Sequence, residues 1–270
     1  MDQTACGGAF LRLLGRGTPQ RDYLVQLGLP KGRVFLGYDA VDNSYFSRKC
    51  EEIRGEGPNF RQQYRLPERY FLASARFVEK KNLSRLLQAY ARYREQDIEC
   101  LWHLVLLGDG PLKSDIRSLI HDFSLQECVH LPGFKQYTDL PVYYGLAEAF
   151  VHASTTEQWG LVINEAMASG LPVLVSNRCG CTSDLVLEGL NGFIFDPFAV
   201  DQIAASMGRM ALMDDEGRAK MGTESQKLIA QWGPDRFAEG LIMAARAAVN
   251  APLPRFNFVA RLLLRILLLR

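Results

Sequence analysis

The chain has 270 residues, of which 48% are hydrophobic and 23% are charged, a composition typical of folded globular proteins. Its 31 lysine and arginine residues are balanced by 30 aspartate and glutamate residues. Because a net charge of +1 creates no general attraction to polyanions, we expect no nucleic-acid partner, and any anion-binding site must be local.

Residues 1–40 predict a small segment with one helix and one strand. The stretch "TPQRDYLVQLG" is typical of a helix, and "RVFLGYD" is typical of a strand. Such a unit cannot bury its own faces, so we expect it to dock on other structure. The first residues lack the features of a signal peptide, which favours a cytoplasmic location. Residues 41–66 are rich in Gly, Pro and charge, and we expect them to form a linker.

Residues 67–250 predict a larger α/β domain. Stretches of helical period, such as 82–95 with Asn82 as its expected cap, alternate with short apolar runs. The apolar runs predict strands at 71–77, 102–108, 149–154, 171–176 and 192–197. Because these strands are apolar throughout, they favour a doubly wound, Rossmann-like parallel sheet covered by helices on both faces. Ligands of such sheets bind at the carboxyl ends of the strands, so we expect functional residues in the strand-to-helix loops.

The tail, residues 251–270, is strongly apolar but is interrupted by Arg261, Arg265 and Arg270. Its apolar length falls short of the about 20 residues that a membrane span needs. Arg261 and Arg265 would share one side of a helix. We favour a terminal helix packed on protein, and the alternative is peripheral contact with a membrane.

The six cysteines show no C-x-x-C spacing, so we expect reduced thiols and no metal site. Cys179 and Cys181 lie in the loop "NRCGCTSD", but two thiols without further ligands make a poor metal shell. We therefore favour a plain loop role for them over a metal or redox role.

A basic turn follows the first predicted strand of the larger domain. In "ARFVEKKN", Arg76, Lys80 and Lys81 gather where the chain leaves the carboxyl edge of the sheet. Such a cluster can hold a phosphate or a diphosphate. The alternative is a solvated turn in which Lys80 or Lys81 pairs with Glu79.

A second loop, "STTEQWGLVINEAMASG", combines a helix start with two acids. Gly160 opens the predicted helix, and free N–H groups at Gly160 and Leu161 would bind an anion together with the helix dipole. Carboxylates accept hydrogen bonds from hydroxyls, so Glu165 suits a ribose and Glu157 suits a sugar beyond the phosphates. The alternatives are a capping role for Glu157 and a surface salt bridge for Glu165. With the basic turn, these groups outline a nucleotide-sugar site.

Two other enzyme classes fit these residues less well. A retaining glycosidase would need the carboxyl groups of Glu157 and Glu165 about 5 Å apart across a sugar, which their loop and helix positions disfavour. A dinucleotide dehydrogenase would need a G-x-G-x-x-G motif after the first strand, and the sequence has none there.

Residues 71–200 resemble the retaining glycosyltransferases of the GT-B fold, group 1 or family GT4. The motifs that carry the resemblance are, in order, "ASARFVEKKN", "GDGP" (108–111), "LPGF" (131–134), the E-x7-E element "EQWGLVINEAMASGLPVLVS" and "GLNGFIFDP" (189–197). The resemblance implies that residues 67–250 are the nucleotide-sugar-binding, C-terminal half of a GT-B fold. Residues 1–40 would then be the last helix and strand of an otherwise absent N-terminal domain.

The resemblance also implies the reaction. A hexose would move, with retention and without a metal or cofactor, from a nucleotide-diphosphate donor such as UDP- or GDP-hexose. The acceptor is an unidentified saccharide, lipid-linked molecule or small molecule. Arg76 and Lys81 would neutralise the diphosphate and Glu157 would contact the transferred sugar, which makes these three the expected catalytic residues.

Five further residues would bind the donor without taking part in the transfer. Glu165 would hold the ribose, and Gly160 and Leu161 would face the phosphates. The backbone around Gly133 and Phe134 would border the base.

Two departures from the family pattern limit what the resemblance implies. The loop "NRCGCTSD" keeps Gly180 but has Asp184 where a Gly-Gly pair followed by Glu is common, which leaves the choice of donor sugar open. The glycine-rich loop and acceptor residues of the N-terminal domain have no counterpart in this sequence. We therefore expect the chain to bind donor but to transfer sugar poorly by itself, and the alternative function is a catalytically incomplete nucleotide-sugar-binding module.

Overall fold

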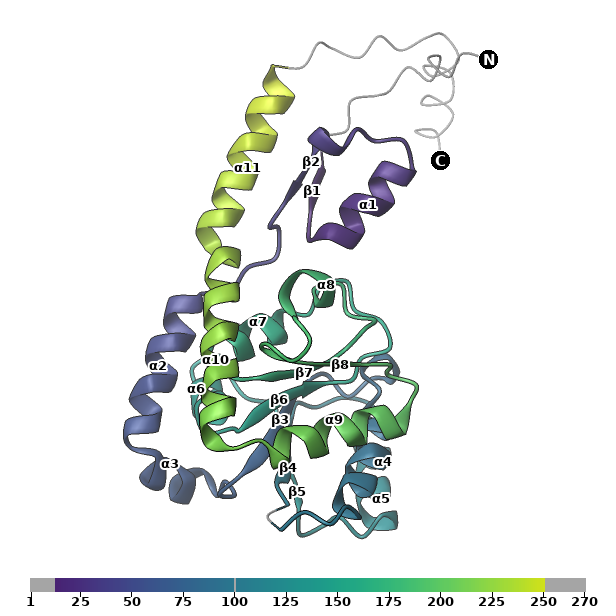
Figure 1. Cartoon of the computed structure of the whole chain (residues 1–270), viewed down its shortest axis with the longest axis vertical. Coiled ribbons are helices and arrows are strands. Elements are labelled where there is room, and N and C mark those ends of the chain that lie inside the picture. Colours follow the sequence, from purple (N-terminus) through teal and green to yellow (C-terminus); the bar gives the residue numbers. More distant parts are fainter. Residues whose placement is uncertain (1–12, 100, 251–270) are drawn as a thin grey trace. The chain divides into compact units, whose positions relative to one another are not determined.

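The structure is a computed structural model that describes residues 13–99 and 101–250 (Figure 1). The chain divides into two compact units. The larger unit is Asp39–Arg236, and the smaller one combines Met1–Tyr38 with Phe237–Arg270. The apolar tail expected at 251–270 lies outside the described residues.

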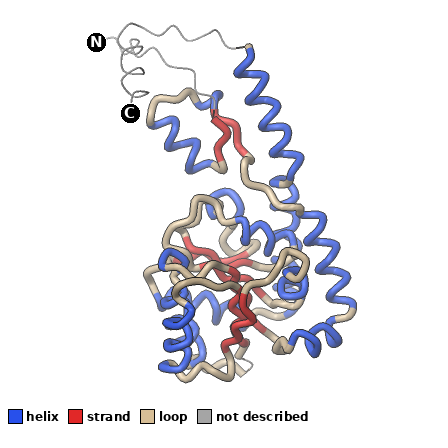
Figure 2. The backbone as a smooth tube through the Cα atoms, turned by 180° about the vertical axis from the view of Figure 1, so that it is seen from behind, coloured by secondary structure: helices blue, strands red, loops and turns tan. Residues whose placement is uncertain are grey.

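The larger unit is built on one parallel sheet of six strands, shown in red in Figure 2. The strand order is β5-β4-β3-β6-β7-β8, and every neighbouring pair is parallel. This order reverses direction between β3 and β6, as in doubly wound folds. The predicted α/β fold with a Rossmann-like sheet is thereby confirmed. The strands are β3 (Tyr70–Ser74), β4 (His103–Leu107), β5 (Val129–Gly133), β6 (Ala149–His152), β7 (Val173–Ser176) and β8 (Gly192–Phe195).

Both faces of this sheet are covered by helices, which explains why its strands are apolar throughout. Alternate residues of a strand enter opposite cores: Phe71 packs in one, and Leu72 packs in the other. The first core is completed by α4 (Leu83–Arg94), α5 (Lys113–Asp122) and α9 (Val200–Leu212). The second is completed by α2 (Asn43–Gly55), α6 (Leu140–Gly145), α7 (Leu161–Ala168), the short α8 (Thr182–Leu185) and the end of α10 (Asp215–Ile229).

The prediction that residues 41–66 form a linker is wrong. This stretch forms α2 and α3 (Gly57–Tyr64), and both belong to the larger unit. Phe46 and Cys50, one helical turn apart, are fully buried in the second core. The Gly and Pro residues that suggested a linker lie at the joint between the helices, where Pro58 occupies the first turn of α3.

The smaller unit contains the helix and the strand expected near its start, together with one strand that the sequence did not predict. Its elements are β1 (Leu13–Gly15), α1 (Thr18–Gln26), the short turn of 3-10 helix η1 (Lys31–Arg33) and β2 (Val34–Leu36). The strands β1 and β2 pair in parallel. The chain's last described helix, α11 (Pro234–Val249), follows the 3-10 turn η3 (Ala230–Trp232) and supplies Phe237, whose ring meets Tyr38 edge-on at 6.0 Å.

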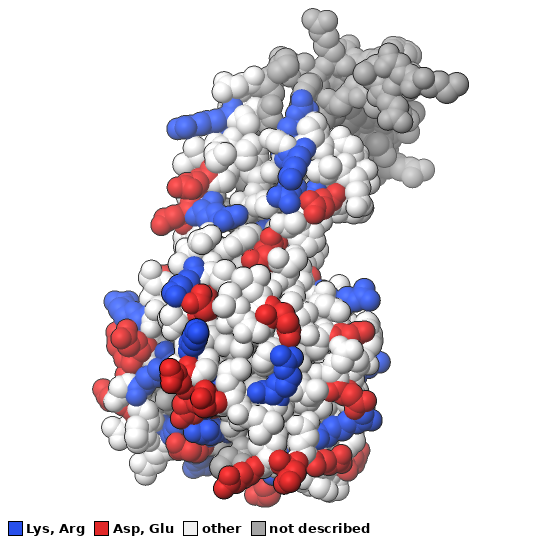
Figure 3. All heavy atoms as spheres, viewed as in Figure 1, with Lys and Arg blue, Asp and Glu red and all other residues white. Residues whose placement is uncertain are grey.

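The surface carries no large region of one charge on the face displayed in Figure 3, where Lys and Arg alternate with Asp and Glu. This distribution agrees with the balanced composition of the sequence. Among the helices that the structure describes, none is both long enough and apolar enough to cross a membrane.

Candidate functional site

The candidate site lies where the strand order reverses, at the carboxyl ends of β3 and β6. These strands are neighbours, but their following helices, α4 and α7, cover opposite faces of the sheet. The two loops therefore separate as they leave the sheet, which is the arrangement that creates a ligand crevice in doubly wound folds. The loop after β3 carries the basic turn, and the loop after β6 leads to the E-x7-E element.

Hydrogen bonds join the two loops. The Lys80 carbonyl accepts from the Thr155 backbone N–H at 2.9 Å and from the Ser154 hydroxyl at 2.7 Å. Asn82 adds a second link, because its amide donates to the carbonyls of Ala153 at 3.0 Å and Pro197 at 2.7 Å. Asn82 occupies the N-cap position of α4, as the sequence predicts, but its side chain makes no cap hydrogen bond and instead ties the strand ends together.

This linkage brings Lys81 into direct contact with Glu157. The Lys81 ammonium forms a hydrogen-bonded ion pair with Glu157 Oε2, and each side chain is only 15% exposed. Lys80 Nζ lies 3.9 Å from the other oxygen, Oε1, and is half exposed. The alternative pairing of these lysines with Glu79 is not what the structure shows. Both lysines instead pair with Glu157.

The protonation state of Glu157 follows from these neighbours. Burial by itself raises the pKa of this carboxyl, but the hydrogen bond and charge of Lys81, with the charge of Lys80, leave the pKa below its ordinary value. His152 lies beneath the pair, with Nε2 4.0 Å from Glu157 Oε2. Burial and the Lys81 charge lower the pKa of His152 to about 3. At neutral pH the site therefore contains an ionised Glu157 and an uncharged His152.

Arg76, the third cation predicted for the site, is exposed at the start of the same turn. Its guanidinium forms no ion pair within the described part of the chain. The loop that carries it is supported by the "GDGP" motif: Phe77 donates its N–H to the Asp109 carbonyl at 2.9 Å. Gly108 has φ +131°, and a Cβ there would lie 1.8 Å from the Ala75 carbonyl oxygen, so only glycine fits. The sequence showed this motif without showing that it supports the basic turn.

Gly160 and Leu161 form the amino end of α7, as the sequence predicts. Gly160 has φ +115°, a conformation that favours glycine, and within the described residues no acceptor is present for the N–H of Gly160 or Leu161. Glu157 lies just before this helix end, and its backbone pairs with the neighbouring loop: its N–H donates to Arg178, and its carbonyl accepts from Gly180 at 2.9 Å. The helix end and the Glu157 carboxylate are thus held in one place.

Glu165 lies one turn into α7 in a different environment. Its carboxylate accepts a hydrogen bond from the Tyr144 phenol at 2.8 Å. Burial raises the pKa of Glu165 to about 7, although the hydrogen bond from Tyr144 acts to lower it. Glu157 and Glu165 therefore have separate partners and opposite pKa shifts. The alternative prediction of a surface salt bridge for Glu165 is wrong, because the partner of this carboxylate is a buried phenol and not a cation.

Gly133 and Phe134 lie at the end of β5, two strands away from β3. The Gly133 carbonyl accepts from the N–H of Gly108, which connects the two glycine-containing turns. The Phe134 ring is 67% exposed. An exposed aromatic ring at the carboxyl edge of the sheet offers a flat apolar surface of the kind on which bases stack.

The loop that departs from the family pattern contains two buried thiols. Cys179 and Cys181 are free cysteines. Burial raises the pKa of Cys179 to about 12 and raises the pKa of Cys181 as well, so both remain protonated and unreactive. No group of three or more His, Cys, Asp or Glu side chains within residues 13–99 and 101–250 is arranged to bind a metal.

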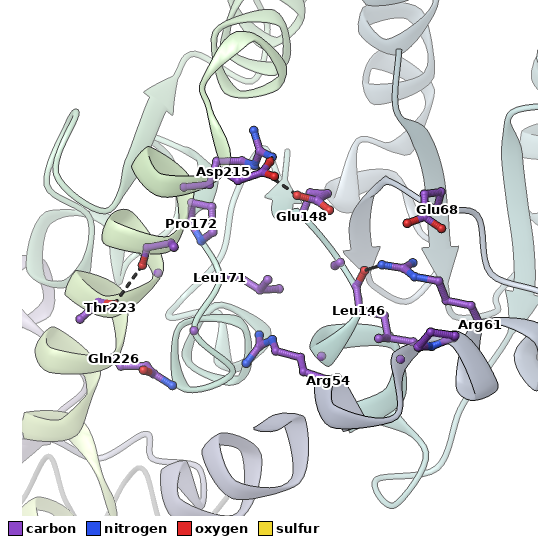
Figure 4. Close-up of a pocket in the computed structure, with 18 residues that line it drawn as sticks. Arg54, Arg61, Glu68, Leu146, Glu148, Leu171, Pro172, Asp215, Thr223 and Gln226 are labelled. Carbon is purple, nitrogen blue, oxygen red and sulfur yellow. Dashed lines mark hydrogen bonds and ion pairs between the residues drawn. The ribbon is translucent and has the colours of Figure 1, made fainter. Parts of the chain in front are cut away.

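A separate cavity of about 590 Å³ lies at the amino ends of the strands, on the opposite edge of the sheet (Figure 4). Glu148 and Pro172, which precede β6 and β7, line it. Two of its arginines bind the carboxyl ends of helices. Arg54 donates to the carbonyl of the C-cap residue of α7, Ser169, at 2.5 Å, and Arg61 donates to the carbonyl of the C-cap residue of α6, Leu146, at 3.1 Å. These contacts account for the arginines as helix caps.

Comparisons with known proteins assign a family to this architecture. Residues 58–228 match the family model described as glycosyl transferases group 1. The chain is 30% identical over 204 residues to alpha-D-kanosaminyltransferase of Streptomyces kanamyceticus, covering 75% of this chain and 51% of that protein. It is 30% identical over 190 residues to the GDP-mannose-dependent alpha-(1-6)-phosphatidylinositol monomannoside mannosyltransferase of Mycobacterium tuberculosis, covering 67% and 48%. The chain spans about half the length of these relatives.

Solved structures share the fold. A glycosyltransferase from Rickettsia africae superposes with a TM-score of 0.75 at 14% identity, covering 90% of this chain and 65% of that chain. HepE of Anabaena, crystallised in complex with UDP, superposes with a TM-score of 0.68 at 20% identity, covering 87% and 62%. These likenesses confirm the GT-B-type fold that the motifs predicted.

Proposed function

This chain belongs to the group 1 glycosyl transferases, and on that premise we propose that it binds a nucleotide-diphosphate sugar for transfer to an acceptor with retention. The chain would supply mainly the donor-binding lobe. The observation that carries the proposal is the ion pair of Lys81 and Glu157 beside the amino end of α7, at the carboxyl edge of the sheet. It combines a cation for a diphosphate with an acceptor for sugar hydroxyls in one place.

We assign the diphosphate to the basic turn and the helix end. Arg76 has no competing carboxylate among the described residues, so its full charge is available to a ligand. Lys81 would exchange part of its contact with Glu157 for a phosphate oxygen. The free N–H groups of Gly160 and Leu161 add donors and the positive end of the α7 dipole. Such fixed positive groups stabilise the diphosphate as charge develops on it during departure, so the proposal needs no metal.

We assign the sugar, the ribose and the base of the donor to residues of the other loops at this edge of the sheet. Glu157 would accept hydrogen bonds from hydroxyls of the transferred sugar, and Glu165 would accept them from the ribose. The base would lie along Gly133 and the exposed ring of Phe134. The M. tuberculosis relative is named for GDP-mannose, and HepE has been crystallised with UDP and with UDP-glucose. UDP- and GDP-hexoses are therefore the donors to test first.

The second candidate function is a donor-binding module that does not catalyse transfer by itself. It is favoured by the finding that the chain spans about half the length of its curated relatives. For the acceptor we propose only a chemical class: a saccharide, a lipid-linked molecule or a small metabolite.

Calorimetry with UDP, GDP and ADP tests the proposal. We expect saturable binding of at least one nucleotide and a loss of affinity in Glu165→Ala and Lys81→Ala. A chain that binds none of the three, or variants with unchanged affinity, would refute the assignment. A second assay, release of nucleotide from UDP- or GDP-hexose with simple acceptors, separates the two candidates, since only the enzyme releases nucleotide at a rate that depends on acceptor.

A further inference from the structure

Tyr144 reaches the candidate site from α6, a helix that carries none of the residues predicted from sequence. Its side chain is fully buried, and its phenol donates to Glu165 Oε2 at 2.8 Å. The Val162 carbonyl, the one further acceptor for the phenolic proton within residues 13–99 and 101–250, is more distant at 3.4 Å. The shorter bond to a carboxylate is the stronger of the two.

The phenol ring is itself held in place by aromatic packing. It packs against Phe46 and Phe150, each with a centroid distance of 5.7 Å. Burial raises the pKa of Tyr144 well above its ordinary value, so the phenol keeps its proton at neutral pH. The fixed ring therefore presents a protonated hydroxyl to Glu165 from a buried position, where a hydrogen bond to a carboxylate is strengthened.

This geometry leaves part of Glu165 available to a ligand. Within the described residues, the carboxylate accepts no hydrogen bond from any side chain except Tyr144. An ionised carboxylate has about four lone-pair sites. Once Tyr144 occupies one of them, Oε1 and the remaining lone pair of Oε2 can accept two further donors. Neighbouring hydroxyls on a five-membered sugar ring provide such a pair.

We propose that Tyr144 is a positioning residue for donor binding: its hydrogen bond holds Glu165 in the orientation that accepts both hydroxyls of the donor ribose. This inference rests on the proposed function, because it requires a ligand with a ribose. Tyr144 acts through Glu165 and does not itself contact the donor.

The charges around Glu165 explain why the phenol matters. Burial alone favours the protonated carboxyl, and the hydrogen bond from Tyr144 is the interaction that opposes this shift in pKa. Among the described residues, Tyr137 also lies within reach of the Glu165 charge, and its phenol, whose pKa is raised by burial, is uncharged at neutral pH. Without the Tyr144 hydroxyl, a larger share of Glu165 is protonated at pH 7, and one of its oxygens becomes a donor instead of an acceptor.

The test is the variant Tyr144→Phe, which keeps the packed ring and removes only the hydroxyl. Calorimetry measures the affinity for UDP and GDP, and for their 2′,3′-dideoxy counterparts, between pH 6 and pH 8.5. We expect the affinity for the ribose nucleotide at pH 7 to fall about tenfold, the size of a lost hydrogen bond to a charged group. Affinity for the dideoxy nucleotide should not change, and the pH midpoint of ribose-nucleotide binding should move upward.

Tyr143→Phe is the matched control. This neighbouring phenol is equally buried, and its ring lies within 5.5 Å of the Lys135 ammonium, outside the Glu165 contact. The control should keep the preference for ribose nucleotides and the wild-type pH profile. A carbon-13 NMR titration of the Glu165 carboxyl without ligand should show a higher pKa in Tyr144→Phe than in wild type.

The outcomes separate this inference from the proposed function. If wild-type protein binds neither UDP nor GDP, both are overturned. If it binds a nucleotide but does not distinguish the ribose form from the dideoxy form, the nucleotide site stands and the role of Tyr144 is overturned. The same conclusion follows if Tyr144→Phe retains the wild-type preference and pH midpoint.

Discussion

Lys81 and Glu157 are 76 positions apart in the sequence, yet their side chains form a hydrogen-bonded ion pair in which each is only 15% exposed. The pair exists because β3 and β6 are neighbouring parallel strands and their loops are joined through the Lys80 carbonyl. A cation and an anion that are both largely removed from water depend on each other, because either one alone is left without compensation. This dependence gives the first prediction.

Replacing Lys81 by methionine should lower the free energy of unfolding by about 1–3 kcal/mol, since it leaves the Glu157 carboxylate largely buried without its main partner. The double variant Lys81→Met with Glu157→Gln should recover part of this loss. Urea denaturation of the single and double variants measures both effects. The exposed pair of Lys49 and Glu52 is the control, and Lys49→Met should change stability by less than about 0.5 kcal/mol. No recovery in the double variant would mean that the ion pair does not stabilise the fold.

Replacing Arg76 by glutamine should weaken nucleoside-diphosphate binding without weakening the fold, because this guanidinium is exposed and forms no ion pair among the described residues. The loss should be largest at low salt, since an exposed charge acts on a ligand through a screened field. Calorimetry with UDP or GDP at two salt concentrations measures the effect. Lys220→Gln, an exposed cation on α10, should leave affinity unchanged. Equal affinity of Arg76→Gln and wild type at low salt would remove Arg76 from the site.

Glutamine at position 165 should stabilise the protein at alkaline pH. The pKa of Glu165 is about 7 in the folded chain against an ordinary value of 4.5, so the folded state binds the extra proton between these values. Glu165 therefore stabilises the fold least above pH 7, where its buried carboxylate is ionised. We expect Glu165→Gln to raise the free energy of unfolding by about 1–3 kcal/mol at pH 8 and by much less at pH 4.5.

Denaturation of wild type and Glu165→Gln across this pH range measures the difference. A gain in stability that is the same at pH 4.5 and pH 8 would show that Glu165 does not titrate in the folded protein with a raised pKa. The variant should also bind nucleoside diphosphate more weakly, because the proposed function assigns the ribose hydroxyls to the Glu165 carboxylate.

Replacing Gly160 by alanine should destabilise the fold and weaken the proposed binding of a diphosphate at the α7 end. A Cβ at this φ of +115° is strained, and it would lie 3.0 Å from Ile163 Cδ1. We expect a loss of about 1–2 kcal/mol in unfolding free energy and weaker binding of UDP or GDP as the α7 end moves. Gly55→Ala is the control, because a Cβ at Gly55 meets no atom within 4 Å and its φ is not positive. If both alanine variants behave alike in denaturation and in calorimetry, Gly160 has no special conformational role.

The order of strands and helices in the larger unit was predictable because each element has a local signature. Apolar runs without alternation indicated a sheet covered on both sides, and the helices alternating with them indicated parallel strands. The linker prediction for 41–66 failed because only two residues of α2, Phe46 and Cys50, are fully buried, and most of its other residues are polar. Local composition describes what a segment exposes, whereas burial of two side chains depends on what packs against it.

The candidate residues could be singled out from the sequence, because cations, a helix-opening glycine and carboxylates have recognisable chemistry and spacing. Their interactions could not be predicted. Nothing in the spacing of the chain indicates that Lys81 pairs with Glu157 instead of Glu79, or that Asn82 binds the ends of two other strands. Neither Tyr144 nor His152 was singled out, since a buried aromatic or histidine near a strand has no pattern that separates a partner of the site from an ordinary core residue.

The sequence by itself determined the fold class, the family resemblance and the identity of the charged groups, because these depend on residue type and on order along the chain. The tertiary structure decided which charges face each other and how deeply each is buried. Glu157 and Glu165 are the same amino acid, only eight positions apart, yet the pKa of one is lowered and that of the other is raised. The difference arises because a lysine from the neighbouring loop meets one carboxylate, while a phenol from another helix meets the other, and only folding brings those partners into contact.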